Sequence, residues 1–212
     1  MIKILIADDY VLIREGLKKV VKREPDMEVV AEATNGAEVL RLLQKTEVDL
    51  VVLDISMPVR DGIDVLKDIS KYYPTIPVLI LTMHSEKKYA VRALVSGAAG
   101  YLTKEGAARE LIVAIRKIYE GGKYVSPALA EHLVEAMRSG NTQDKAHDQL
   151  SNKEFQIMCM LAAGKTVKQV SEDLHITAST VHTYKNRIYK KMSMATIPEF
   201  TRYCLQHNLI EA

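Results

Sequence analysis

Short apolar runs alternate with helical patterns along the first 120 residues. The apolar runs occupy residues 2–7, 28–33, 50–53, 78–81 and 100–103, and helical spacing of apolar residues occupies 12–23, 37–43, 65–73, 87–96 and 107–119. Because the runs are apolar throughout rather than at every second position, they predict strands buried on both faces. Five strands alternating with five helices predict an α/β domain with a doubly wound parallel sheet, the flavodoxin-like (βα)5 fold, over residues 1–120.

The pattern changes after residue 120. We interpret residues 121–149 as a linker, with a helical pattern at 127–137 and a polar, aperiodic stretch at 139–149. Ser151 and Glu154 then fit a capping box at the start of a helix. Residues 150–212 carry only short helical patterns, so the second domain is expected to be all-α.

A helix-turn-helix is predicted over about 167–186. A short amphipathic helix at 167–174 precedes a tight turn, and a recognition helix follows at about 178–192, capped by Thr177 or Ser179. The outward and flanking side chains of this second helix are short polar groups and cations, namely Thr180, His182, Thr183, Lys185, Asn186, Arg187, Lys190 and Lys191. Short polar groups for base edges beside cations for phosphates favour binding in the DNA major groove. The alternative is a solvated basic helix face.

Composition indicates the cellular compartment of the protein but does not determine its function. No apolar run approaches the roughly 18 residues needed to cross a membrane. The N-terminus reaches Asp8 and Asp9 too soon for a signal peptide. Two cysteines, Cys159 and Cys204, cannot form a disulfide framework and lie in apolar helical stretches, which indicates a reducing compartment. We therefore expect a cytoplasmic protein with no membrane partner.

Charge becomes informative only when it is divided along the chain. The net charge of +2 splits into +1 over residues 1–125, −2 over 126–150 and +3 over 151–212. Four cations of the second domain, Lys185, Arg187, Lys190 and Lys191, fall within seven residues. That local cluster suits a polyanionic partner.

Charged or hydroxylic residues stop four of the apolar runs. Asp8 and Asp9 follow the first, Asp54 the third, Thr82 the fourth and Lys104 the fifth. An Asp after a strand is often only a helix cap. In an open parallel sheet, however, the carboxyl ends of the strands form the ligand site, and four suitable strand ends together are hard to attribute to chance.

These residue types suit phosphoryl transfer. Three neighbouring carboxylates repel one another unless a hard cation lies among them, and Mg²⁺ accepts carboxylates together with phosphate oxygens. A carboxylate can itself attack phosphorus and form an aspartyl phosphate. Lys104 can supply an ammonium to the transferring group, and Thr82 a hydroxyl donor.

Residues 1–120 resemble the receiver domains of two-component response regulators. The resemblance is carried by Asp8-Asp9, by Asp54-Ile55-Ser56-Met57-Pro58 with Asp61-Gly62 after it, by Leu81-Thr82, and by Tyr101-Leu102-Thr103-Lys104. It implies that Asp54 is the phosphoacceptor, with Thr82 and Lys104 assisting. It also implies that Mg²⁺ is bound by Asp9, Asp54 and the backbone carbonyl of Ser56, with Asp8 acting through water. Thr82 and Tyr101 would form the conformational switch, although spacing alone favours simple strand packing for Tyr101.

Residues 150–212 resemble the LuxR-type helix-turn-helix output domain of NarL/FixJ regulators. Leu150-Ser151-Asn152-Lys153-Glu154, Ala163-Gly164-Lys165, Thr180-Val181 and the pattern at 198–209 carry this resemblance. By position, His182, Thr183 and Asn186 would face bases, and Lys185, Arg187 and Lys190 phosphates. The chain departs from the family pattern at Tyr184, Ser171 and Ser193, which stand where His, Ala and Gly are usual.

The two resemblances together imply a DNA-binding transcriptional regulator that is not an enzyme beyond its own phosphoryl transfer and dephosphorylation. A sensor histidine kinase would donate phosphate to Asp54, and promoter half-sites in double-stranded DNA would bind a phosphorylated homodimer. One alternative is a receiver-controlled scaffold or RNA-binding regulator. The other is an aspartyl-phosphate phosphatase, which would want a second Asp two residues after the nucleophile, where this chain has Ser56.

Overall fold

A computed structural model describes residues 1–83, 86–138, 146–207 and 209–210 of the chain. These residues divide into two compact units, Met1–Ser139 and Gly140–Ala212. Within the described ranges, no helix is both long enough and apolar enough to cross a membrane.

The first unit is a five-stranded parallel sheet with strand order β2-β1-β3-β4-β5. Its strands are β1 (Ile2–Ala7), β2 (Met27–Ala33), β3 (Leu50–Leu53), β4 (Val78–Thr82) and β5 (Gly100–Thr103). The helices are α1 (Val11–Val21), α2 (Gly36–Leu43), α3 (Gly62–Tyr72), α4 (Glu86–Val95), α5 (Lys104–Tyr119) and α6 (Pro127–Arg138). The predicted doubly wound α/β fold is confirmed, and the expected bounds of β1, β3 and β5 match the structure.

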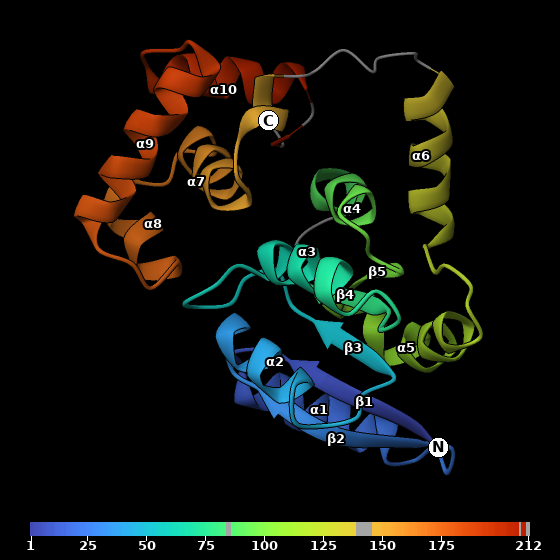
Figure 1. The fold of residues 1–212 in the computed structure, drawn as a ribbon. Coiled ribbons are helices and arrows are strands. Elements are labelled where there is room, and N and C mark those ends of the chain that lie inside the picture. Colours follow the sequence, from blue (N-terminus) through green and yellow to red (C-terminus); the bar gives the residue numbers. More distant parts are fainter. Residues whose placement is uncertain (84–85, 139–145, 208, 211–212) are drawn as a thin grey trace. The chain divides into compact units, whose positions relative to one another are not determined.

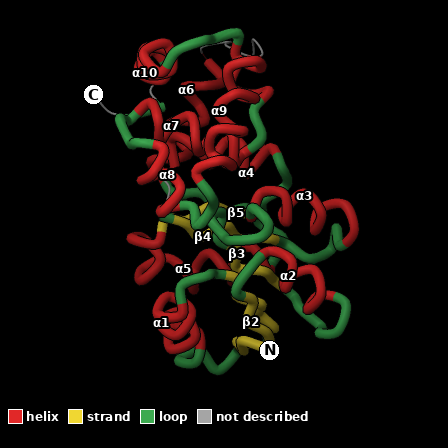
Figure 2. Tube along the Cα trace, turned by 90° about the vertical axis from the view of Figure 1, so that its left-hand side faces the viewer, coloured by secondary structure: helices red, strands yellow, loops and turns green. Residues whose placement is uncertain are grey.

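Helices cover both faces of this sheet, with α1 and α5 on one side and α2 and α3 on the other (Figure 2). Ile4 and Ile6 of β1 and Leu102 of β5 pack in one cluster with Leu17 of α1 and Leu111 of α5. Alternate side chains of a strand point to opposite faces. Leu5 and Tyr101 therefore face the other layer, where they are also fully buried.

Strand β2 differs from the expectation of burial on both faces. Only its two ends, Met27 and Ala33, are buried, and Glu28 and Glu32 are exposed. The reason is topological: β2 lies at the edge of the sheet and pairs only with β1 among the named strands.

The opposite edge, β5, is covered by the chain that follows α5. The N–H of Tyr101 donates to the carbonyl of Tyr124 at 3.1 Å, and the N–H of Tyr124 donates to the carbonyl of Ala99 at 2.9 Å. Gly100 allows this approach, because a Cβ there would lie 2.8 Å from the Tyr124 carbonyl oxygen. From this anchor the chain enters α6, which packs against α4 (Figure 1).

The second unit is helical. It comprises a 3₁₀ turn η1 (Ala146–Gln149) and helices α7 (Asn152–Ala162), α8 (Val167–Asp173), α9 (Ala178–Met192) and α10 (Ile197–Gln206). The predicted capping box of Ser151 and Glu154 is present. Thr177, rather than Ser179, caps the recognition helix α9 by accepting from the N–H of Thr180. Of the linker expected at 139–149, residues 139–145 lie outside the described residues.

The recognition helix is held by a buried stripe and by its two ends. Val181, Ile188 and Met192 are buried, as the helical pattern predicts. At its end, Lys191 Nζ lies 2.6 Å from Oε2 of Glu154, whose side chain is only 4% exposed. Ser193 then adopts a left-handed conformation with φ of 51°, which explains why glycine suits this position.

Candidate functional site

Three carboxylates meet at the carboxyl ends of β1 and β3. These strands are neighbours in register, with Ala7 opposite Leu53, so the residues that follow them come together. Oxygens of Asp8, Asp9 and Asp54 all lie within 4.8 Å of one another. Asp8 and Asp54 are almost fully buried. Such a set of oxygens fits a hard cation such as Mg²⁺, because the mutual repulsion of the three charges would be neutralised there.

Lys104 lies at the same point. As the first residue of α5 it follows β5, and its Nζ is 2.6 Å from Oδ2 of Asp8 and 2.7 Å from Oδ2 of Asp54. Burial alone would lower the pKa of Lys104, but the charge of Asp54 and the hydrogen bonds to both carboxylates raise it. Burial raises the pKa of Asp8, although the hydrogen bond from Lys104 opposes this effect. The four side chains thus form one charged cluster.

The loop after β3 is shaped around Asp54. The N–H of Ser56 donates to Oδ1 of Asp54 at 3.4 Å, and the N–H of Gly62 donates to the carbonyl of Ile55 at 2.8 Å. A Cβ on Gly62 would lie 2.0 Å from the carbonyl oxygen of Asp54. Gly62 is therefore required for the loop to approach the backbone of the phosphoacceptor candidate, and Asp61 before it caps α3.

The two expected switch residues occupy neighbouring strands. Thr82 ends β4, next to β3 in the sheet, and is fully buried. Tyr101 lies opposite Ile80 in β4 and is also fully buried. It therefore lies within the sheet, before the carboxyl end of β5. The structure thus brings Asp8, Asp9, Asp54 and Lys104 together. Thr82 lies at an adjacent strand end, and Tyr101 lies two residues before the end of β5.

Arg14 is a site residue that the sequence analysis missed. Its side chain is 9% exposed, and its Nη1 donates to the backbone carbonyl of Asp8 at 2.7 Å. A signal was available: Arg14 occupies the buried stripe of α1 together with Leu17 and Val21. A cation on the inward face of a helix needs a buried partner.

The recognition helix α9 presents a polar, cationic surface. His182, Thr183, Asn186, Arg187 and Lys190 are exposed, whereas Thr180 and Lys185 are half-buried. The hydroxyl of Thr180 is 2.8 Å from that of Thr177, so Thr180 takes part in the N-terminal cap as well.

Two cations of this surface lie over aromatic rings. The Arg187 guanidinium carbon is 5.8 Å from the Tyr184 ring centroid, and Lys185 Nζ is 5.9 Å from that of Tyr189. Lys191, by contrast, is bound to Glu154. It therefore contributes to the fold rather than to the cluster of cations that could meet a polyanion.

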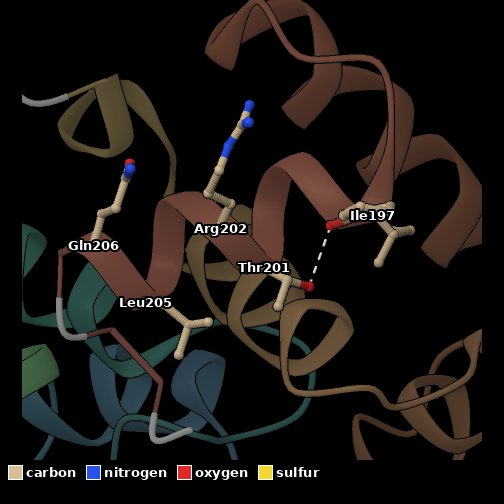
Figure 3. Close-up of a pocket in the computed structure, with 6 residues that line it drawn as sticks. Ile197, Thr201, Arg202, Leu205 and Gln206 are labelled. Atoms are coloured by element: carbon tan, nitrogen blue, oxygen red, sulfur yellow. Dashed lines mark hydrogen bonds between the residues drawn. The ribbon is translucent and has the colours of Figure 1, made fainter.

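A shallow hollow lies along α10 of the second unit (Figure 3). It is lined by Ile197, Pro198, Thr201, Arg202, Leu205 and Gln206. The Thr201 hydroxyl is turned to the backbone and donates to the carbonyls of Ala162 and Ile197, so the lining is mainly aliphatic.

An aspartate cluster at the strand ends of a doubly wound sheet, on one chain with a helix-turn-helix, defines a receiver-type regulator with an output domain. Comparison with known proteins agrees: residues 4–116 match the response regulator receiver domain, and residues 148–204 match the luxR family of bacterial regulatory proteins. The response regulator GacA of Pseudomonas aeruginosa is 32% identical over 212 residues, covering 100% of this chain and 99% of GacA. The chain therefore belongs to the response regulators with a LuxR-type output domain, the NarL/FixJ family.

Solved structures give the same result. A LuxR-family two-component response regulator from Aurantimonas sp. SI85-9A1 has a TM-score of 0.60 and 36% identity, covering 64% of this chain and 96% of that one. RcsB of Salmonella enterica serovar Typhimurium, bound to promoter rprA in the presence of the phosphomimetic BeF3⁻, has a TM-score of 0.62. At 23% identity over 95% of this chain and 97% of RcsB, the second likeness shows the fold alone.

Proposed function

We propose that this response regulator accepts a phosphoryl group on Asp54 from a sensor histidine kinase and thereby controls promoter binding by its C-terminal domain. The observation that carries the proposal is the buried contact of Lys104 with both Asp8 and Asp54, inside a cluster of three carboxylates within 4.8 Å. The only reactions that the protein would catalyse are its own phosphorylation and dephosphorylation. As a regulator of chromosomal promoters it would act in the cytoplasm.

The roles at the site follow from charge and position. Asp9, Asp54 and the Ser56 carbonyl would hold Mg²⁺, with Asp8 acting through water, and the ion would offset charge on the transferring group. An oxygen of Asp54 forms the new bond to phosphorus while the bond to the kinase imidazole breaks. Lys104, already 2.7 Å from Asp54, neutralises charge on the phosphoryl oxygens.

The signal then passes through β4 and β5. Phosphorylation adds a charge of about −1.5 to −2 at Asp54. Thr82 ends the neighbouring strand β4, from which its hydroxyl would donate to that group, and Tyr101 of β5 would move inward behind it. We propose that this pair shifts between two arrangements and that the shift alters the face formed by α4, β5 and α5.

In the second unit, α9 is proposed to read the major groove. His182, Thr183 and Asn186 would contact bases, while Lys185, Arg187 and Lys190 would contact phosphates. Thr180, in the first turn of the helix, would also contact the DNA. The support is their position on a helix-turn-helix of the luxR family, with all but Thr180 and Lys185 exposed. Two copies, paired after phosphorylation, would occupy two half-sites of double-stranded DNA.

Acetyl phosphate labelling tests the first half of this proposal. Wild type should acquire an acid-stable, base-labile phosphate in Mg²⁺, whereas Asp54→Ala and Asp54→Asn should acquire none. Persistent label in either variant would remove Asp54 from the proposed role.

Genome-wide DNA capture with wild type beside Asp54→Ala tests the second half. Enriched fragments should share paired half-sites and be lost in the variant, and binding to duplex DNA should fall steeply with salt. Lys185→Ala should weaken binding about equally across sequences. Capture of RNA in place of duplex DNA would favour an RNA-binding regulator.

A further inference from the structure

The buried guanidinium of Arg14 is the starting point. Three contacts fix Asp8 through its other groups: its N–H donates to the carbonyl of Ala33 at 3.1 Å, Oδ1 accepts from the N–H of Tyr10, and Oδ2 contacts Lys104. Arg14 acts on the remaining group, the backbone carbonyl, at 2.7 Å. That carbonyl belongs to the peptide bond that leads into Asp9.

We infer that Arg14 is a positioning residue for the metal ligand Asp9. A peptide unit is planar, so holding the Asp8 carbonyl fixes the plane from which the Asp9 side chain departs. Groups that orient metal ligands from behind contribute strongly to affinity, since a misdirected ligand loses part of its bond to the ion. The inference rests on the proposed metal site formed by Asp9 and Asp54.

The charge of Arg14 acts in the opposite sense. Oxygens of the three carboxylates lie within 4.8 Å of one another, and the ammonium of Lys104 contacts two of these carboxylates. Arg14 brings a second buried cation close behind the Asp8–Asp9 peptide, where it contacts a carbonyl oxygen at 2.7 Å. This cation repels an incoming metal ion, so the loss of affinity expected on removing Arg14 comes from the lost hydrogen bond to the Asp8 carbonyl and not from the lost charge.

A purely structural role for Arg14 can be separated from this one. Arg14 Nε also lies 3.4 Å from Oε2 of Glu32 on β2, and Lys18 Nζ lies 2.7 Å from Oε1 of the same residue. These pairs link α1 to β2 without contacting the acidic loop. Glu32→Gln weakens that link and leaves the bond from Arg14 to Asp8 in place, so it is the matched control for Arg14→Met.

The test measures binding of Mn²⁺, a spectroscopic substitute for Mg²⁺, to the full-length chain by electron paramagnetic resonance of the free ion. Arg14→Met should bind about tenfold more weakly than wild type. Arg14→Lys, which can still donate to the carbonyl, should recover most of the loss, and Glu32→Gln should match wild type. In acetyl phosphate labelling, Arg14→Met should need about tenfold more Mg²⁺ for half-maximal rate but reach a similar rate at saturation.

Unchanged Mn²⁺ affinity in Arg14→Met, or an equal loss in Glu32→Gln, would overturn the inference. If Arg14→Met does not fold, Arg14→Leu, which also lacks a donor, takes its place, and affinity equal to wild type would have the same meaning. Asp9→Asn separates this result from the proposed function. If wild type binds no Mn²⁺, or Asp9→Asn binds it as well as wild type does, the metal site itself is wrong; if Asp9→Asn alone loses binding, only the role of Arg14 is wrong.

Discussion

The ammonium of Lys104 contacts two buried carboxylates at once, Oδ2 of Asp8 at 2.6 Å and Oδ2 of Asp54 at 2.7 Å. Because the pKa of Lys104 is raised above its usual 10.5, this bridge is complete at neutral pH and would be lost only as the pH rises through the raised value. In phosphorylated protein the same ammonium is positioned to follow the charge to the phosphoryl oxygens. Lys104 is therefore expected to matter more for the response to phosphorylation than for the transfer itself.

We predict that Lys104→Ala still accepts phosphate from acetyl phosphate but does not dimerise in response. The physical reason is that Asp54 and Mg²⁺ suffice for transfer, whereas the ion pair that distinguishes the two states is gone. Labelling followed by light scattering checks this. Dimerisation of the labelled variant to the wild-type extent would contradict it.

Gly62 offers a second test at the residue scale. In Gly62→Ala the new Cβ would lie 2.0 Å from the carbonyl oxygen of Asp54, so the loop has to move. We expect a loss of at least about 2 kcal/mol in unfolding free energy, together with slower labelling.

Gly16→Ala is the matched control. Gly16 lies in the middle of α1, and a methyl group there would have no neighbouring atom within 4 Å, so alanine should stabilise the helix by about 0.5–1 kcal/mol. Urea unfolding of both variants provides the measurement, and equal effects would show that the close approach to Asp54 has no consequence.

At the scale of elements, the attachment of α9 to α7 depends on an ion pair. Burial would raise the pKa of Glu154, but hydrogen bonds from Lys191 and Ser151 hold it below its usual 4.5. A depressed carboxyl pKa contributes stability above its unfolded value, and that stability is lost as the pH falls through the folded value. The packing of the recognition helix should therefore weaken below about pH 4.5.

Hydrogen exchange of the α7 and α9 amides at neutral and acid pH measures this effect. Glu154→Gln should lower the local opening free energy by about 2 kcal/mol at neutral pH and show a smaller further loss on acidification. Glu172→Gln removes an exposed carboxylate of α8, 3.9 Å from Lys168, and should change little. Equal acid sensitivity in wild type and Glu154→Gln would exclude the pair as the cause.

The order of the elements could be predicted from sequence, while several boundaries could not. Helices α3 and α5 begin three residues earlier than the apolar spacing indicates, because Asp61 and Thr103 cap them and polar first turns carry no apolar signal. The edge position of β2 was missed because the pattern of apolar residues does not determine the order of strands in a sheet.

At the site, the strand-end rule was enough to place the carboxylates and Lys104 together, since it depends only on where each apolar run stops. Arg14 could not be found in that way. Its contact is with a backbone carbonyl, and no side-chain motif encodes such a partner.

At the scale of the molecule, the two units have separate cores. Both phenylalanines of the chain, Phe155 and Phe200, are buried in the second unit, whereas the first unit buries mainly aliphatic residues together with Tyr89 and Tyr101. The link between phosphate at Asp54 and DNA binding at α9 must accordingly be measured on the whole chain.

The backbone pairing of Tyr124 with β5 determines where a receiver fragment can end. A chain stopped at residue 120 would lose this pairing and leave the β5 edge with unused donors and acceptors, which invites edge-to-edge aggregation. We expect unphosphorylated fragment 1–120 to self-associate and fragment 1–138 to remain monodisperse in sedimentation velocity. Tyr124→Phe in the longer fragment loses the hydroxyl bond to Glu110 but keeps the backbone pairing with β5, so it should behave like its parent. If 1–120 proves equally monodisperse, residues 121–138 are dispensable to the solubility of the domain.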